Sequence, residues 1–354
     1  MSVWFALAAA LGMIGFLVKA RFHYLLLPEL PAEPLPKEED ISVVIPARDE
    51  EANITGVVTS FAGAPVIVVD DGSNDRTVEL ARQAGAAVIP APPLDPRLMG
   101  KPNACLAGAQ ASDSYWILFV DADTRYQPSF LNSLANYARR EKLQAASVFL
   151  KQERITWAER MLLPYAFALY FCGVNSRQVN NPKSREALAN GQCLLFRRQA
   201  YDFVGTHAAV AGSVIEDVAL ARILKRHRMN SRVLRAEHLG SVRMYDSFGA
   251  IWRGFQKNSF RFLAVNPGSG AQVIGASILL TSYIPVLIFL LREGHRWIAA
   301  VFAVIPSLLL LPWYGSVVDA LLAPAAIYVF QLIALNAMAT SLFGRKAIWK
   351  GRRV

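Results

Sequence analysis

The sequence predicts an α/β domain with a mostly parallel sheet, flanked by apolar segments that can enter a membrane. Between about residues 40 and 266, apolar runs of strand length alternate with helical stretches. Strands that are apolar throughout and separated by helices are typical of parallel sheets covered on both faces. Apolar residues make up 54% of the 354 residues and charged residues 18%, and the apolar excess lies at the two ends. This composition exceeds that of an ordinary soluble enzyme.

The first apolar segment, residues 3–18, predicts a transmembrane anchor that is short but adequate. A cleaved signal peptide would carry basic residues before its apolar run, whereas Lys19 and Arg21 follow this one. Basic residues mark the cytoplasmic side of a span, so we expect an uncleaved anchor over residues 1–22 with its N-terminus outside. The stretch PELPAEPLPKEED, residues 28–40, holds four prolines and five acids, and it predicts a linker over about residues 23–39.

The alternation of strands and helices begins at Ile41. The runs ISVVIPA, PVIVVDD, AAVIPA and YWILFVDAD have the composition of buried strands. The helical stretch before Gly85 has Ser73 or Asn74 in position to cap its start. The predicted strands are 41–47, 65–71, 86–91 and 115–123, and the predicted helices are 50–61, 73–85 and 102–112.

The C-terminal part, residues 267–344, predicts more membrane segments, with apolar runs at about 272–291, 296–313 and 317–343. Three C-terminal spans in addition to the N-terminal anchor would leave the C-terminus outside. The basic tail 345–354 predicts instead that the C-terminus lies inside. One segment that is re-entrant or lies flat would resolve this conflict. Basic flanks of this kind explain part of the net charge of +10. Without a zinc spacing or a nucleic-acid module, we expect the bilayer as partner and no nucleic acid.

An apolar, aromatic-rich stretch, MLLPYAFALYFCG, occupies residues 161–173 inside the α/β region. It is too short to span a bilayer. We expect an interfacial helix that lies at the bilayer surface. A buried core helix is the alternative, because length and composition fit both.

Polar and mainly acidic residues follow three of the predicted strands. The strand ends read PARDE at residues 46–50, DDGS at 70–73 and DAD at 121–123. In parallel sheets the carboxyl ends of the strands meet at one edge, where ligands bind. If the strand continues through Asp123, this residue and Asp121 point to the same face, and their charges repel unless a cation or a ligand compensates. A simple turn is the alternative for this pair.

These motifs, in this order and spacing, resemble those of family 2 glycosyltransferases. The resemblance covers about residues 40–265 and the tail, and it implies a GT-A fold, which is Rossmann-like, for residues 40–266 with transmembrane helices on both sides. The C-terminal motifs are similar to the membrane-bound branch that glycosylates lipids such as carotenoids and hopanoids. The matching stretches are IPARDEE, VVDDGSNDRT, GKPNA (100–104), VDADT, ANGQCLLFRRQAY (189–201), IEDVALARILKRH (215–227), WRGFQKN (252–258) and WKGR (349–352).

The resemblance implies an enzyme of the hexosyltransferase type. It would transfer a single sugar, with inversion, from a UDP-sugar or another nucleotide-sugar to a hydroxyl or carboxyl of a membrane lipid. Mg²⁺ or Mn²⁺ would neutralise the diphosphate leaving group. We expect a multi-pass protein of the inner cell membrane with its catalytic domain in the cytoplasm.

The resemblance also implies roles for the acidic residues. Asp217 is the expected catalytic base and Glu216 completes the catalytic pair, although both acids could also cap a helix start. Asp123 is the expected metal ligand, and Asp121 is expected to contact the metal and the ribose of the donor. Asp71 would accept a hydrogen bond from the base of the nucleotide.

Lys101 would reach the diphosphate as a point charge, with an exposed lysine at a helix start as the alternative. Arg48 would line the nucleotide pocket, with a surface ion pair as the alternative. The remaining expected site residues are Ala47, Glu50, Asp70 and Ala122 for the donor, Asn190, Gly191 and Gln192 for the acceptor, and Lys257 and Asn258 for donor phosphate or acceptor.

Two departures from the family pattern are informative. Asp49 stands where the family commonly has Asn, which leaves the role of this position open. The Gln-x-x-Arg-Trp motif of processive synthases is absent, since the nearest string, EGHRW at 293–297, lacks the Gln. This favours a single transfer over a processive polysaccharide synthase.

A membrane nucleotidyltransferase and a non-catalytic lipid-binding protein are two further candidate functions for such a chain. A nucleotidyltransferase would carry a glycine-rich opening after its first strand, and this sequence has none. A binding protein with a decayed transferase domain would have lost some of the acids, whereas the acids of all the motifs are intact. Both features favour the glycosyltransferase.

Overall fold

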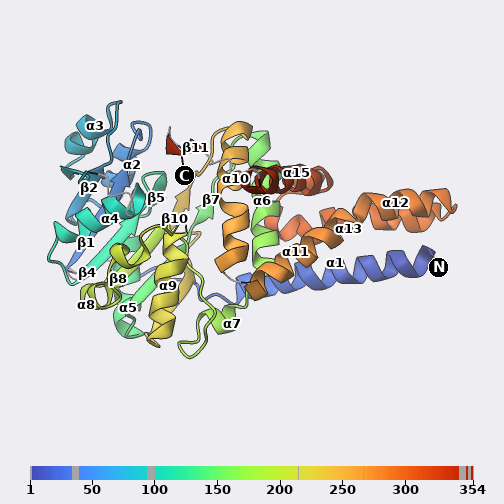
Figure 1. Cartoon of the computed structure of the whole chain (residues 1–354), viewed down its shortest axis with the longest axis horizontal. Helices are drawn as coiled ribbons and strands as arrows, with labels where there is room; N and C mark the ends of the chain where they lie inside the picture. Colours follow the sequence, from blue (N-terminus) through green and yellow to red (C-terminus); the bar gives the residue numbers. More distant parts are fainter. Residues whose placement is uncertain are drawn as a thin grey trace. The chain divides into compact units, whose positions relative to one another are not determined.

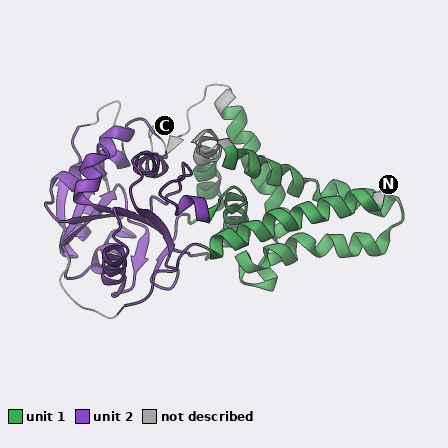
Figure 2. Ribbon diagram, turned by 90° about the horizontal axis from the view of Figure 1, so that it is seen from below, with its two compact units in different colours: residues 1–26, 154–176, 245–354 green, residues 27–153, 177–244 purple. Residues whose placement is uncertain are grey.

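The computed structural model describes residues 2–33, 40–93, 100–213, 215–265, 267–342, 348–349 and 352–353. The chain divides into two compact units (Figure 2). Residues 27–153 and 177–244 form one, here called the sheet unit. Residues 1–26, 154–176 and 245–354 form the other, here called the helical unit.

The sheet unit contains a seven-stranded sheet in the order β3-β2-β1-β4-β8-β6-β9 (Figure 1). Strand β8 runs antiparallel to both of its neighbours, and the other neighbouring strands are parallel. The predicted mostly parallel α/β sheet is therefore confirmed. The strands are β1 Ile41–Ala47, β2 Val66–Asp70, β3 Ala87–Pro90, β4 Trp116–Val120, β6 Ala145–Phe149, β8 Cys193–Arg197 and β9 Ser231–Arg235.

Both faces of this sheet are buried, as the apolar runs predict. Val43, Ile45 and Leu118 face one core, and Val44 and Phe119 face another. Helices and loops cover each face, and the acids Asp70, Asp71, Asp121 and Asp123 stand at or after the ends of their strands. The helices of this unit are α2 Ile54–Thr59, α3 Thr77–Gln83, α4 Lys101–Gln110, α5 Phe130–Arg140, α8 Arg198–Phe203, the 3₁₀ turn η1 His207–Val210 and α9 Glu216–Arg226, with the short α7 Ser176–Val179 at the border of the two units.

Two helices start later than predicted. Helix α2 begins at Ile54 rather than at residue 50, and α3 begins at Thr77 after Arg76 as its N-cap residue. The predicted capping by Ser73 or Asn74 is therefore wrong. The physical reason is that the residues before each helix form hydrogen bonds between the two loops instead of continuing a helix.

The DAD motif lies in a turn and not at the end of a strand. Strand β4 ends at Val120, and β5 Thr124–Tyr126 joins a second sheet with β10 Gly240–Val242 and β7 Lys151–Gln152. The amide of Thr124 donates to the carbonyl of Asp121 at 3.3 Å and closes the turn. The expectation that the strand reaches Asp123 is therefore wrong, although the motif still follows the carboxyl end of β4.

Among its described residues, the helical unit contains four helices that are long and apolar enough to cross a membrane, at residues 3–25, 268–292, 296–314 and 323–340. This agrees with apolar helices at both ends of the chain. Its helices are α1 Ser2–Leu25, α6 Trp157–Cys172, α10 Phe248–Val265, α11 Pro267–Thr281, α12 Tyr283–Arg292, α13 Arg296–Tyr314, α14 Val317–Ala320 and α15 Ala323–Leu342, and two short strands follow at β11 Ile348–Trp349 and β12 Arg352–Arg353.

Helix α6, which contains the stretch 161–173, packs against α1, α11, α13 and α15. Its Leu162, Tyr165, Ala168 and Phe171 are fully buried. The structure therefore fits the buried core helix and not the interfacial helix that we expected. It also groups residues 154–176 and 245–265 with the helical unit, so the expected domain 40–266 is interrupted and ends earlier. The reason is that these two amphipathic or apolar segments bury their faces against the apolar helices.

Candidate active site

The acidic strand ends of the sequence meet at one edge of the sheet unit. Strand β1 lies between β2 and β4 and is parallel to both, so the three carboxyl ends are neighbours. Ala47 pairs with Asp70 in the register, and the amide of Asp71 donates to the Ala47 carbonyl at 2.9 Å. Asp70 accepts a hydrogen bond from the Ser73 amide at 3.1 Å. This edge is where ligands bind in α/β sheets of this kind.

Lys101, the first residue of α4, connects the predicted motifs. Its ammonium lies 2.6 Å from Oδ1 of Asp121 and 3.9 Å from Oε1 of Glu216, and it donates to the Gly191 carbonyl at 2.8 Å. Burial alone would lower the pKa of Lys101, but the charges of Asp121 and Glu216 raise the pKa above its ordinary value. The side chain is therefore a fixed cation between two acidic motifs, and the interpretation as an exposed lysine does not fit.

Glu216 and Asp217 are the first two residues of α9. One carboxylate oxygen of Asp217 accepts the Gly191 amide at 2.7 Å, and the other accepts the amide of Val218 at 2.8 Å. Gly191 thus uses its N–H for Asp217 and its carbonyl for Lys101. A Cβ at this position would lie 3.2 Å from the Lys101 ammonium and 3.3 Å from the Asp217 carboxylate, so a larger residue would require both groups to shift by a few tenths of an ångström.

The environment of Asp217 suits a proton acceptor. Burial, and after it the negative charge of Glu216, raise the pKa of Asp217 to about 7. Lys101 and the two backbone N–H groups oppose this rise in pKa. A carboxylate with a pKa near neutrality can accept and release a proton during turnover, which is the property of a general base. Asp217 is not the N-cap residue of α9, which is Ile215, but its carboxylate accepts the amide of Val218 in the first turn of the helix.

Asp123 has the surroundings of a metal ligand. Burial, the charge of Asp121 and the charge of Glu50 raise the pKa of Asp123 to about 8. Within the described part of the chain, its Oδ1 is buried without a hydrogen-bond partner. A buried carboxylate oxygen that lacks a donor is destabilising unless a proton or a cation satisfies it.

The other groups at the edge fit a cation held together with a ligand. No cluster of three or more His, Cys, Asp or Glu side chains able to hold a metal occurs among the described residues. Mg²⁺ in phosphate-binding sites uses only one or two carboxylates, and phosphate oxygens and water complete its shell. The two carboxylates of Asp121 and Asp123 would match this requirement for a cation that arrives with a diphosphate.

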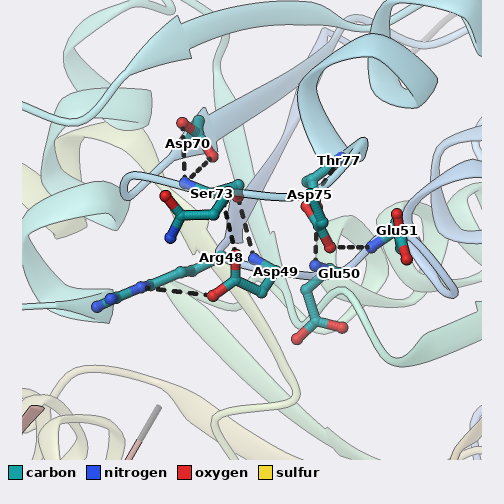
Figure 3. A network of polar contacts seen from close by, with 9 residues as sticks. Arg48, Asp49, Glu50, Glu51, Asp70, Ser73, Asp75 and Thr77 are labelled. Carbon is teal, nitrogen blue, oxygen red and sulfur yellow. Dashed lines mark hydrogen bonds and ion pairs between the residues drawn. The ribbon is translucent and has the colours of Figure 1, made fainter. Parts of the chain in front are cut away.

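The loops that follow β1 and β2 bind each other through their backbone amides. The amides of residues 49, 50 and 51 donate to Ser73 Oγ at 3.0 Å, Thr77 Oγ1 at 2.8 Å and Asp75 Oδ2 at 3.1 Å. In return, Asp49 Oδ1 accepts the amide of Asn74 at 2.8 Å and Glu51 Oε2 accepts that of Arg76 at 3.2 Å. Figure 3 shows the contacts of residues 49–51 with Ser73, Asp75 and Thr77. We call the whole set of hydrogen bonds between residues 49–51 and 73–77 the loop clasp.

The loop clasp decides which groups are free to bind a ligand. It uses the backbone amides just before α3, so this helix start does not offer them to a phosphate group as a free helix N-terminus would. The Glu50 carboxylate points away from the clasp in Figure 3 and accepts a hydrogen bond from Asn53 at 2.9 Å. Arg48 lies 3.8 Å from the Asp49 carboxylate, in agreement with the interpretation as an ion pair.

The predicted acceptor residues lie beside this site. The backbone N–H of Asn190 donates to Ser147 Oγ at 2.7 Å, and its side-chain amide donates to Gln192 Oε1 at 3.0 Å. The Gln192 carbonyl accepts the amide of Asp121 at 3.2 Å, which ties this segment to the DAD turn. Ala122 is buried within that turn.

Two predicted residues belong to the other unit, and the structure does not test their roles. Lys257 and Asn258 lie on α10 of the helical unit, and their side chains are outside those that the structure describes. A hollow of about 680 Å³ in the sheet unit includes Asp40, Trp116 and Arg197, but none of the predicted site residues lines it. It lies at the amino end of β4, opposite to the edge where ligands bind in such sheets.

Reasoning from the sequence missed several groups. Arg125 follows the DAD turn. Burial lowers the pKa of its guanidinium, and the negative charges of Asp123 and Glu50 oppose this change. Its guanidinium occupies the space above Gly56, where a Cβ would lie 2.4 Å from Nε, so this glycine makes room for the cation. The loop clasp was missed as well, although the left-handed φ of 51° at Asp49 agrees with the preference of Asp and Asn for that conformation.

Residues 42–205 match the family model described as glycosyl transferase family 2. A 4,4'-diaponeurosporenoate glycosyltransferase of Staphylococcus haemolyticus (strain JCSC1435) is 28% identical over 252 residues, which cover 68% of this chain and 66% of the relative. The protein of the same name from Staphylococcus aureus (strain USA300) is 25% identical over 250 residues, covering 68% and 65%. The match thus spans slightly less than two thirds of each relative.

Among solved structures, a mannosyltransferase from Pyrobaculum calidifontis in complex with GDP-Man and Mn²⁺ is similar in fold. It superposes with a TM-score of 0.61 at 14% identity, and the match covers 98% of this chain and 100% of that one. At this identity the likeness concerns the fold, which is the GT-A type of mixed sheet together with apolar helices.

Proposed function

We propose that the chain is a family 2 glycosyltransferase, which the match of residues 42–205 to that family model and the similarity to named glycosyltransferases support, and that it transfers a single sugar from a nucleotide-sugar, of the UDP-sugar class, to a membrane lipid. The observation that carries this proposal is the position of Asp217. The Gly191 amide donates to the Asp217 carboxylate at 2.7 Å, and the Gly191 carbonyl accepts a hydrogen bond from Lys101. The ammonium of Lys101 in turn pairs with Asp121. A base for the acceptor and the charges for the leaving group therefore belong to one connected set.

The proposed reaction is a direct displacement at the anomeric carbon. Asp217 removes the proton from an acceptor hydroxyl as its oxygen attacks, and the bond from the anomeric carbon to the donor diphosphate breaks. A single displacement inverts the configuration of that carbon. Lys101 is available to stabilise negative charge on the departing diphosphate, because it is held as a cation beside Asp121.

Asp121 and Asp123 are the residues that would hold Mg²⁺ or Mn²⁺. The unsatisfied Oδ1 of Asp123 supports this assignment. A bound cation would supply Lewis-acid stabilisation of the diphosphate. The clasped loops, which carry Arg48 and Glu50 after β1 and Asp71 after β2, would surround the nucleotide, while Asn190 and Gln192 would line the acceptor side.

A lipid acceptor and an inner-membrane location are supported by the four candidate spans and by the names of the relatives. Basic residues at the ends of the apolar segments support a cytoplasmic catalytic domain. The acceptor group would be a hydroxyl or a carboxyl. Only the hydroxyl requires a base, because a carboxyl is already ionised near neutral pH.

The test is an incubation of the purified chain in detergent with a panel of sugar nucleotides, Mn²⁺ and a lipid extract. Mass spectrometry of the lipids should detect the addition of one sugar. Addition of a nucleoside monophosphate would indicate a nucleotidyltransferase, and a ladder of sugars would indicate a processive synthase. Binding of UDP with no product from any donor would indicate a non-catalytic protein and would contradict the proposal.

A further inference from the structure

Asp49 makes the central contacts of the loop clasp. Its amide donates to Ser73 Oγ at 3.0 Å, and its Oδ1 accepts the amide of Asn74, the next residue, at 2.8 Å. The two bonds run in opposite directions and join consecutive residues of the second loop. This pairing fixes the distance and the rotation between the loops that follow β1 and β2.

The backbone of Asp49 makes this position selective for residue type. Its φ of 51° lies in the left-handed region, which Asp and Asn adopt more readily than other residues with a side chain. Asn carries an Oδ1 that can accept the same bond from the Asn74 amide. Glycine adopts the same φ freely but has no acceptor. Alanine lacks the acceptor and is strained in this conformation.

We propose that Asp49 is a positioning residue for the donor nucleotide, which it does not itself bind. It holds the loop of Ala47, Arg48 and Glu50 against the loop of Asp70 and Asp71 before a ligand arrives. This inference rests on the proposed function, because it assigns the nucleotide to these two loops. It also answers why Asp can stand where similar sequences commonly carry Asn: the acceptor oxygen and the left-handed backbone are what the position requires.

Pre-ordering of binding loops acts mainly on affinity. A ligand that must order two loose loops loses binding free energy, whereas a ligand that meets ordered loops does not. The base Asp217 and Lys101 are outside the clasp, so the chemical step is not affected. Loss of one hydrogen bond of this kind should weaken nucleotide binding by about tenfold.

The experiment compares four variants of the full chain, purified in detergent, by titration with UDP in the presence of Mn²⁺. Asp49→Asn should bind UDP as the wild type does, and Asp49→Gly and Asp49→Ala should each bind about tenfold more weakly. The glycine variant separates the hydrogen bond from backbone strain. Asp113→Ala removes an exposed carboxylate of the same unit, and it should leave binding unchanged. The transfer rate at saturating donor should remain within about threefold in all four variants.

Hydrogen exchange of the Asn74 amide provides a readout that does not depend on sugar transfer. Exchange should accelerate in Asp49→Gly and Asp49→Ala but not in Asp49→Asn. Wild-type UDP affinity in Asp49→Gly, or an Asp49→Asn variant as weak as Asp49→Ala, would overturn the positioning role. Unchanged exchange in Asp49→Ala would overturn the clasp itself. A wild type that binds neither UDP nor GDP would refute the proposed function, and the positioning role with it, even if the exchange data support the clasp.

Discussion

At the scale of single residues, Asp123 combines a buried, unsatisfied carboxylate oxygen with a pKa raised to about 8. We predict that Asp123→Asn abolishes the metal-dependent part of UDP binding, because the amide oxygen is a weaker ligand and carries no charge. Calorimetric titration with and without Mn²⁺ measures this directly. Asp113→Asn, which changes an exposed carboxylate of the same unit, is the control. Unaltered metal dependence in Asp123→Asn would show that the cation is held elsewhere.

The pKa of Asp217, raised to about 7 by burial and by Glu216, predicts the pH dependence of the enzyme. A base acts only when deprotonated, so the transfer rate at saturating substrates should be low below pH 7 and rise to a plateau above it. The positive charge of Lys101 lowers the pKa of Asp217. Lys101→Met should therefore move the rise in rate to higher pH as well as slow the reaction.

A rate profile recorded from pH 5 to 9 checks both statements. If the midpoint did not move in Lys101→Met, Asp217 would not be the group that titrates. A rate that is flat across this range in the wild type would indicate a carboxylate acceptor, for which no base is needed.

At the scale of elements, α4 places Lys101 through its contact with the sheet. A Cβ on Gly108 would lie 2.3 Å from a methyl group of Val44 and 3.0 Å from one of Val69, so the glycine allows the helix to lie directly on β1 and β2. Gly108→Ala should push α4 outward and displace Lys101 at its start. Overpacking of this kind costs about 1–3 kcal/mol of stability.

Thermal unfolding and UDP titration together check this prediction. Both stability and affinity should fall in Gly108→Ala, whereas Gln110→Ala, on the exposed side of the same helix, should change neither. Normal stability and affinity in Gly108→Ala would contradict the packing argument.

The sequence predicted the elements that depend on a local pattern. The apolar runs of β1, β2, β3 and β4 and the acids after three of them identified both the sheet and its binding edge. The starts of α2 and α3 were not predicted, because the amides of residues 49–51, of Asn74 and of Arg76 bind across two loops that are about 25 residues apart in the sequence. Such non-local hydrogen bonds leave no periodic signal.

The same limit applies to α6 and to Gly191. The composition of residues 161–173 fits an interfacial helix and a core helix alike, and only the packing of other helices around Tyr165 and Phe171 decides between them. Gly191 was expected to line the acceptor pocket, but its two hydrogen bonds to Lys101 and Asp217 depend on chain segments far from it in sequence.

At the scale of the whole molecule, the conflict over the C-terminus has a structural answer within the helical unit. Helices α1, α12 and α13 pack on one another, and α1 and α13 run side by side in Figure 1. Helix α15 packs mainly on α10 and α6, and neither of these two is among the candidate spans of the described residues. It also has the lowest mean hydropathy of the four candidates, 1.4.

We therefore predict that α1, α11–α12 and α13 cross the membrane and that α15 does not. The N-terminus would then lie outside and the basic tail inside, as the distribution of basic residues indicates. A cysteine placed at Val354 should react with a membrane-impermeant maleimide in inverted vesicles and not in intact cells, since the three native cysteines are buried. Labelling in intact cells would show that α15 crosses.

The most direct test of the central claim, that Asp217 is the base of a sugar transfer, is a comparison of donor binding and product formation in Asp217→Asn. Asn preserves the shape, and its Oδ1 can still accept one of the two backbone N–H groups that Asp217 binds. The variant should bind the donor with wild-type affinity and form lipid-linked sugar about 10²- to 10⁴-fold more slowly. Near wild-type transfer by Asp217→Asn, together with loss of transfer in Glu216→Gln, would assign the base to Glu216. Full activity in both variants would contradict the mechanism.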